Sequence, residues 1–226
     1  MSEPADASGE HTPPPAAGEP SAPAVSFITT EHFTLQGARS QTIAESTGRA
    51  SMFLASVSGG LVAWGLVATA TSGAGGGFFA FGLVLLPTLA FVGLVTLERT
   101  LQSGVEDLGY ARRIARLRAY YFDNAPELAP YLLSVEPEAR LRVQGLVGGL
   151  FQEFRTVAGM VAVITAVLVG AEAGLAVIWV FDAPVASFAA GGVVALGSLF
   201  AMMKYIGSAW HRAAAERINP YEFPDH

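Results

Sequence analysis

The sequence predicts an all-α integral membrane protein with four transmembrane helices. Residues 50–97 contain no Lys, Arg, Asp or Glu, and residues 156–203 contain only two charged residues, Glu172 and Asp182. A helix needs about 20 apolar residues to cross a bilayer core of roughly 30 Å, so each run is long enough for two crossings joined by a turn. The composition agrees with this, because only 14% of the 226 residues are charged, against about 25% in soluble domains.

The chain before the first crossing divides into two parts. Residues 1–25 are rich in Pro, Ala, Ser, Gly and Glu, and a segment with so little apolar surface to bury is predicted to be a disordered acidic tail. Residues 26–50 are predicted to form an interfacial helix that runs into the first crossing, with Thr30 as its N-cap. No secretory signal is expected, because residues 1–38 contain no Lys or Arg.

Two transmembrane hairpins are predicted, over residues 51–97 and residues 156–205. Pro87 lies at the centre of the second crossing, where it removes one backbone hydrogen bond and should kink the helix. Such a kink can mark a gate or have no mechanistic role. Small residues allow helix backbones to approach closely in lipid. The glycines assigned to helix packing are Gly59, Gly60, Gly170 and Gly174.

The central segment, residues 98–155, is predicted to form a cytoplasmic helical hairpin between the second and third crossings. Apolar residues recur every three or four positions and predict a coiled-coil-like seam. Pro126 and Pro130 should end the first helix of this hairpin, and a second helix should begin near Pro137. The seam consists of Leu97, Leu101, Val105 and Leu108, followed on a shifted line by Tyr110, Ile114, Leu117 and Tyr121.

The distribution of basic residues predicts the orientation in the membrane. Two Lys or Arg residues precede the first crossing, eight lie in the central segment, three lie near the C-terminus, and neither hairpin turn contains any. Cytoplasmic loops carry the excess of Lys and Arg, so both termini, including a C-terminal tail over residues 206–226, are expected in the cytoplasm. Twelve of the thirteen basic residues are Arg, which with the many Ala and Gly residues is typical of a GC-rich bacterial genome, and the inner membrane is the expected location.

Glu172 is the candidate polar site within the membrane. An ionisable residue inside an apolar helix is by default a functional hypothesis. However, counting about 20 residues from Thr156 ends the third crossing near Leu175, and the carboxylate would then lie at the outer interface. The sequence leaves both locations open.

A basic cluster near the end of the seam is the candidate contact for anions or lipids. It can act as a topology signal that also contacts lipid headgroups, as a site for a cytosolic anionic ligand such as a nucleotide, or as a docking site for a partner protein. Its members are Arg112, Arg113, Arg116 and Arg118.

No catalytic or metal-binding pattern is present in the sequence. There is no cysteine, no two of the four histidines have a ligand spacing, and no GxSxG, HExxH or kinase motif occurs. We therefore expect no enzyme activity, no cofactor, no metal and no nucleic-acid partner.

Two stretches resemble uncharacterised four-helix integral membrane proteins of actinobacteria. They are FTLQGARSQTIAESTGRASMFLASVSGGLVA and RRIARLRAYYFDNAPELAPYL. This resemblance covers most of the chain and implies no known activity. The chain is also similar, in layout alone, to SLATT and Pycsar-type membrane effectors. The shared layout is a polar helix, then a transmembrane hairpin, then a long cytosolic helix. That similarity would imply oligomerisation and membrane disruption in response to a nucleotide signal.

These observations predict a non-enzymatic multi-pass membrane protein that forms homo-oligomers through its small-residue faces and its seam. One alternative is a small channel or transporter that uses Glu172 and Pro87, since each half of the chain enters, turns and returns in the layout of a parallel repeat. Another is a membrane effector that responds to a small-molecule ligand, whose identity the sequence does not indicate.

Overall fold

The computed structural model describes residues 22–71, 75–124 and 156–215. These residues form helices and no strand. Each helix is long and apolar enough to cross a membrane, so the all-α class and the presence of four candidate transmembrane helices are confirmed. The helices are α1 (Ala22–Ala70), α2 (Gly76–Asn124), α4 (Val157–Phe181) and α5 (Pro184–Ala215).

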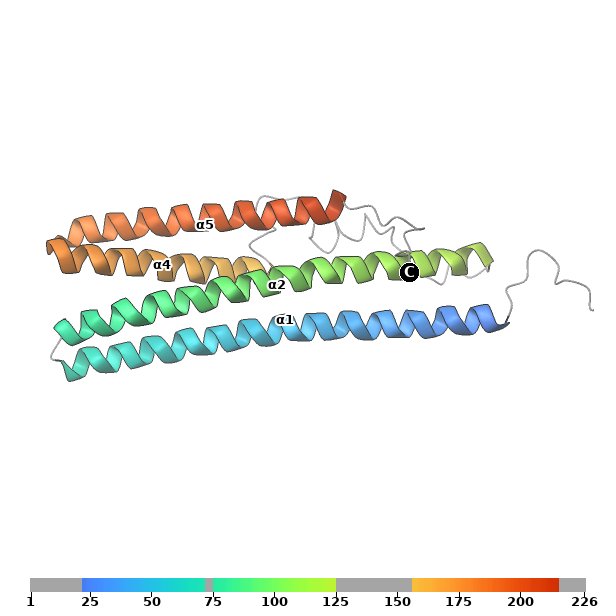
Figure 1. Ribbon diagram of the computed structural model, residues 1–226, viewed down its shortest axis with the longest axis horizontal. Helices are drawn as coiled ribbons and strands as arrows, with labels where there is room; N and C mark the ends of the chain where they lie inside the picture. Colours follow the sequence, from blue (N-terminus) through green and yellow to red (C-terminus); the bar gives the residue numbers. More distant parts are fainter. Residues whose placement is uncertain (1–21, 72–74, 125–155, 216–226) are drawn as a thin grey trace, which may run out of the picture.

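The helices pack in the order α1, α2, α4, α5, each antiparallel to the next (Figure 1). Among the described residues, α1 and α5 make no contact with each other and occupy the two edges of this arrangement. The C-terminal ends of α1 and α4 and the starts of α2 and α5 lie at one end of the molecule, and α1 and α2 reach farther than α4 and α5 at the other end (Figure 1). We call residues 22–49 of α1 and 98–124 of α2 the stalk. The last turns of α5 lie beside the start of the α2 part, where a Cβ on Gly104 would lie 3.1 Å from the Trp210 ring.

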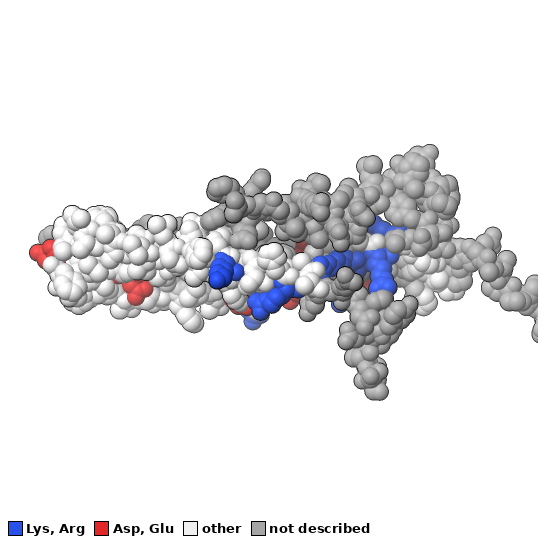
Figure 2. Space-filling view, turned by 90° about the horizontal axis from the view of Figure 1, so that it is seen from above, with Lys and Arg blue, Asp and Glu red and all other residues white. Residues whose placement is uncertain are grey.

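The part of the molecule outside the stalk has the thickness of a membrane. Residues 76–97 of α2 contain no charge and number 22, which at a rise of 1.5 Å per residue is about 33 Å. The hydrocarbon core of a bilayer is about 30 Å thick. We call residues 50–71, 75–97 and 156–203 the uncharged half, because they contain no Lys or Arg and only two carboxylates, Glu172 and Asp182. Figure 2 shows a face on which this end of the molecule is white apart from acidic patches, whereas Lys and Arg side chains gather farther along.

Glycines bring α1, α2 and α4 together at two levels of the uncharged half. A Cβ placed on Gly82 would lie 2.6 Å from the Trp64 ring of α1 and 2.7 Å from Leu175 of α4. A Cβ on Gly93 would collide with Thr165 of α4 and lie 3.0 Å from the Phe53 ring of α1. Backbones in lipid approach closely through such positions.

Local capping explains where α4 begins and ends. The Thr156 hydroxyl accepts a hydrogen bond of 3.0 Å from the Gly159 N–H and so satisfies one free donor of the first turn. At the other end Asp182 adopts the left-handed conformation, with φ 49°, and its N–H donates to the Ile178 carbonyl. The chain then reverses directly into α5, where the Ser187 hydroxyl donates to the Gly174 carbonyl at 2.7 Å.

The predicted segments map onto these helices as follows. Residues 26–50 run into the first crossing within one continuous helix, and they pair with α2 as one side of the stalk. The prediction of Thr30 as the N-cap is wrong, because α1 begins at Ala22 and the Thr30 hydroxyl donates to the Ser26 carbonyl inside the helix. The second crossing likewise continues without a break through Pro87 to Asn124. The second helix of the predicted central hairpin, near Pro137, lies outside the described residues, as do most of the N-terminal tail and the end of the C-terminal tail.

Candidate functional site

Helix α1 has two different faces. The face toward α2 carries large side chains, and Leu35, Phe53 and Val57 on it are buried. The opposite face carries Gly37, Gly48 and Gly59, which are spaced by eleven residues. Eleven residues are close to three turns of an α-helix, so the three glycines lie along one line of the helix surface.

This line of glycines is open. Among the described residues, a Cβ placed on any of the three would meet no atom within 4 Å, apart from the chain neighbours and the helix's own backbone. Ala44 and Ala55, also eleven residues apart, are exposed on the same side. We call these five residues the glycine line. It runs from the stalk into the uncharged half of α1.

The four glycines assigned to helix packing have different surroundings. Gly60 faces α2, where a Cβ would lie 3.0 Å from Leu89 and 3.2 Å from Leu85. Gly59 faces away from the other described helices and belongs to the glycine line. The structure therefore does not bring the two adjacent glycines to one face.

Gly170 and Gly174 face α5 of the same chain. A Cβ on Gly170 would lie 2.5 Å from the carbonyl oxygen of Gly191, and one on Gly174 would lie 3.2 Å from that of Ser187. This GxxxG pair is therefore filled by α5 and is not available to a second copy. Gly37 and Gly48 were not among the predicted packing residues, although their spacing from Gly59 is visible in the sequence.

Glu172 lies well inside the uncharged half of the molecule. Helix α4 does not end near Leu175 but continues nine residues past Glu172 to Phe181, a rise of about 14 Å. The contacts of Gly82 with Leu175 and of Gly93 with Thr165 set the register between α2 and α4. By interpolation, Glu172 is level with residues 85–86 of α2, at the midpoint of the uncharged stretch 76–97.

The side chain of Glu172 is on the side of α4 that packs against α2. Thr165, Leu168, Glu172 and Leu175 are spaced by three or four residues and therefore share one face. Thr165, Leu168 and Leu175 are buried, whereas Glu172 is half-buried. Within the described part of the chain, the Glu172 carboxylate accepts no hydrogen bond and forms no ion pair.

Pro87 lies within about one turn of the level of Glu172. It is half-buried inside α2, and it has no N–H to donate to the carbonyl of Leu83. Pro87 and Glu172, the two residues on which a transport function would depend, therefore lie at similar levels along the helix axes.

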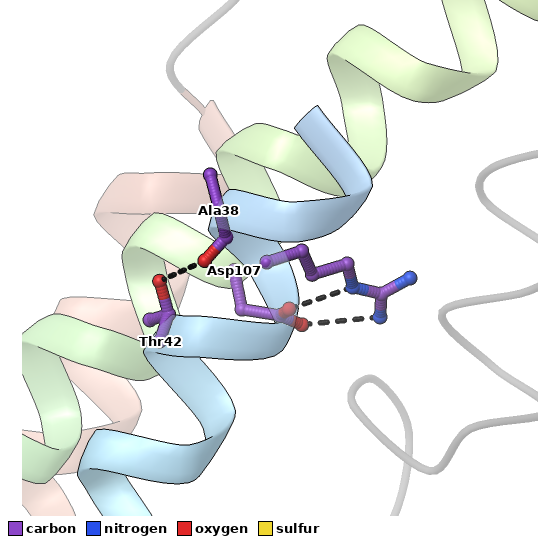
Figure 3. A network of polar contacts seen from close by, with 4 residues as sticks. Ala38, Thr42 and Asp107 are labelled. Carbon is purple, nitrogen blue, oxygen red and sulfur yellow. Dashed lines mark hydrogen bonds and ion pairs between the residues drawn. The ribbon is translucent and has the colours of Figure 1, made fainter. Parts of the chain in front are cut away.

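The stalk is held by an ion pair and an apolar seam. Arg39 of α1 donates to both carboxylate oxygens of Asp107 of α2, from Nε to Oδ1 at 2.6 Å and from Nη2 to Oδ2 at 3.2 Å (Figure 3). One turn along α1, the buried Thr42 donates its hydroxyl to the Ala38 carbonyl at 3.0 Å (Figure 3). The seam residues Leu101, Leu108 and Ile114 of α2 are all buried within the chain.

The four arginines of the basic cluster do not form a single exposed patch. Arg112 caps the C-terminal end of α5, with Nη1 donating to the Ala213 carbonyl at 2.8 Å and Nη2 to that of Ala214 at 3.2 Å. Arg118 is half-buried near His32. Burial lowers the pKa of His32, and the positive charge of Arg118 lowers it further. Of the four arginines, Arg113 and Arg116 are the exposed ones, so they are the better candidates for contact with lipid headgroups, a ligand or a partner.

Comparison with protein-family models, curated proteins and solved structures finds no match to this chain.

Proposed function

We propose that this protein is a non-enzymatic multi-pass membrane protein that self-associates through the glycine line of α1. The observation that supports this proposal is the contrast between the open glycine line and the GxxxG pair of α4, which α5 already fills. Glycine in a helix interior costs about 1 kcal/mol relative to alanine. Three aligned glycines are therefore unfavourable unless another helix packs against them, as small residues allow in lipid.

The proposed assembly is a twofold dimer. Because copies in one membrane share one orientation, their α1 helices run parallel and each glycine line faces the same residues of the partner, which is an isologous interface. A repeat of eleven residues corresponds to 3.67 residues per turn and favours a slightly right-handed crossing. Helix α5 lies at the opposite edge of the molecule and stays free in such a dimer.

The proposed orientation places the stalk and both termini in the cytoplasm of a bacterial cell. The distribution of charge supports it, because the stalk carries Arg39, Arg112, Arg113, Arg116 and Arg118, among others, whereas no Lys or Arg lies at the two hairpin turns.

Disulfide cross-linking tests the self-association directly, because the natural chain contains no cysteine. With Ala55→Cys, we expect a covalent dimer on oxidation of native membranes. With Leu61→Cys, which is equally exposed but about 120° around α1 from Ala55, we expect none. Adding Gly59→Ile to Ala55→Cys should abolish the dimer, whereas adding Gly65→Ile should not, because Gly65 is also open but lies off the line. Equal cross-linking at both cysteine positions, or only monomer at both, would contradict the proposal.

A further inference from the structure

Glu172 places a carboxylate near the mid-depth of the uncharged half. Its level, opposite residues 85–86 of α2, is about 14 Å from the start of α2 at Gly76 and about 17 Å from Leu97. Aromatic pairs lie between this level and the hairpin turns. The rings of Trp64 and Phe78 stack at 4.8 Å, and those of Phe79 and Trp179 at 6.2 Å. The carboxylate is therefore well removed from the outer surface.

Among the residues that the structure describes, no cation lies within the uncharged half to compensate this charge. Residues 50–97 and 156–203 contain no Lys, Arg or His. A second copy of the same chain in the same membrane has the same residues at this depth and supplies no cation either. An ionised carboxylate without a partner is strongly disfavoured in the hydrocarbon region. Its charge must then be neutralised from solution.

We infer that Glu172 is a binding site for a proton or a monovalent metal cation inside the membrane. Glu172 is half-buried and therefore accessible to such an ion, and it shares a helix face with the buried residues Thr165, Leu168 and Leu175. This inference is independent of the self-association, because Glu172 lies on the α2–α4 contact and the glycine line lies on the outer side of α1. Either can fail while the other holds.

Two carbodiimides of different polarity distinguish a membrane site from an interfacial carboxylate. The full-length protein in liposomes is treated either with dicyclohexylcarbodiimide, which partitions into the bilayer, or with a water-soluble carbodiimide and an amine, and labelled peptides are identified by mass spectrometry. Asp182, in the turn between α4 and α5, is the internal control for a carboxylate at the aqueous end.

The expected result is that the apolar reagent labels Glu172 and the water-soluble reagent labels Asp182. The Glu172→Gln variant, which preserves side-chain shape, should lose the apolar label while retaining the label on Asp182. Protection of Glu172 by Na⁺ but not by K⁺ would identify a metal cation as the bound ion, and labelling that changes with pH alone would identify a proton. Labelling of Glu172 by the water-soluble reagent, with none from the apolar reagent at any pH, would overturn the inference.

Discussion

Helices α1 and α2 run through both the uncharged half and the stalk, but they are held together in different ways in the two regions. In the uncharged half these two helices meet at glycines, and a Cβ on Gly82 or Gly93 of α2 would lie 2.6 Å from Trp64 or 3.0 Å from Phe53 of α1. In the stalk Arg39 of α1 forms an ion pair with Asp107 of α2, and leucines of both helices, Leu35 and Leu108, are buried. The difference follows from the solvent, because apolar surface gains nothing by leaving lipid for protein, whereas in water each buried Å² contributes about 25 cal/mol.

The largest expected effect is in the uncharged half. Gly170→Leu forces side-chain atoms into the Gly191 carbonyl and the Ala195 side chain, at 2.5 and 2.6 Å from the ideal Cβ. Overpacking of this kind costs about 1–3 kcal/mol or more, so α4 and α5 should separate at a lower temperature when the protein is melted in detergent. Gly192→Leu is the matched control, because Gly192 adjoins Gly191 but is open. Equal destabilisation by the two variants would show that the glycine contact is not what holds this helix pair.

A smaller effect is expected in the stalk. Asp107→Asn removes the charge that Arg39 contacts through two hydrogen bonds, and both side chains are partly exposed, at 18% and 24%. The loss should be about 1 kcal/mol, since solvent screens the pair. Hydrogen exchange should therefore become faster in the stalk and remain unchanged in the uncharged half. Arg49→Ala, which breaks the more exposed pair with Glu45 within α1, should have a weaker effect. Faster hydrogen exchange in the uncharged half as well as in the stalk would show that the two regions are not independently stable.

The smallest expected effect is a dependence of the stalk on pH. The pKa of His32 is lowered by burial and by Arg118, and its buried Nδ1 has no hydrogen-bond partner within the part of the chain that the structure describes. The unfolded chain therefore binds more protons at this residue than the folded stalk does, so stability rises with pH and is lost as the pH falls below about 6.5. Hydrogen exchange of stalk amides should accelerate on acidification. His32→Gln should remove this dependence, and His211→Gln, at an exposed position, should leave it intact. An unaltered pH profile in His32→Gln would exclude this histidine as the cause.

For the glycine line, the sequence shows the spacing of the glycines but not which of them are open to a second helix. Gly59 was predicted to pack against a helix and Gly170 likewise, but only the fold shows that one is open and the other filled. The spacing of Gly37, Gly48 and Gly59 was available in the sequence, yet a repeat of eleven residues does not indicate which face of α1 meets α2. That choice depends on the large residues opposite, such as Phe53 and Trp64, which pack against the glycines of α2.

The sequence by itself determined that the protein is all-helical, that it has four helices able to cross a membrane, and where the uncharged stretches begin and end, because hydropathy and charge act locally along the chain. Only the tertiary structure decided the depth of Glu172, the use of Arg112 as a cap for α5, and the partner of each glycine. These properties depend on the register and rotation of one helix against another, which are set by contacts between residues far apart in the sequence, such as Gly93 with Thr165 and Arg39 with Asp107.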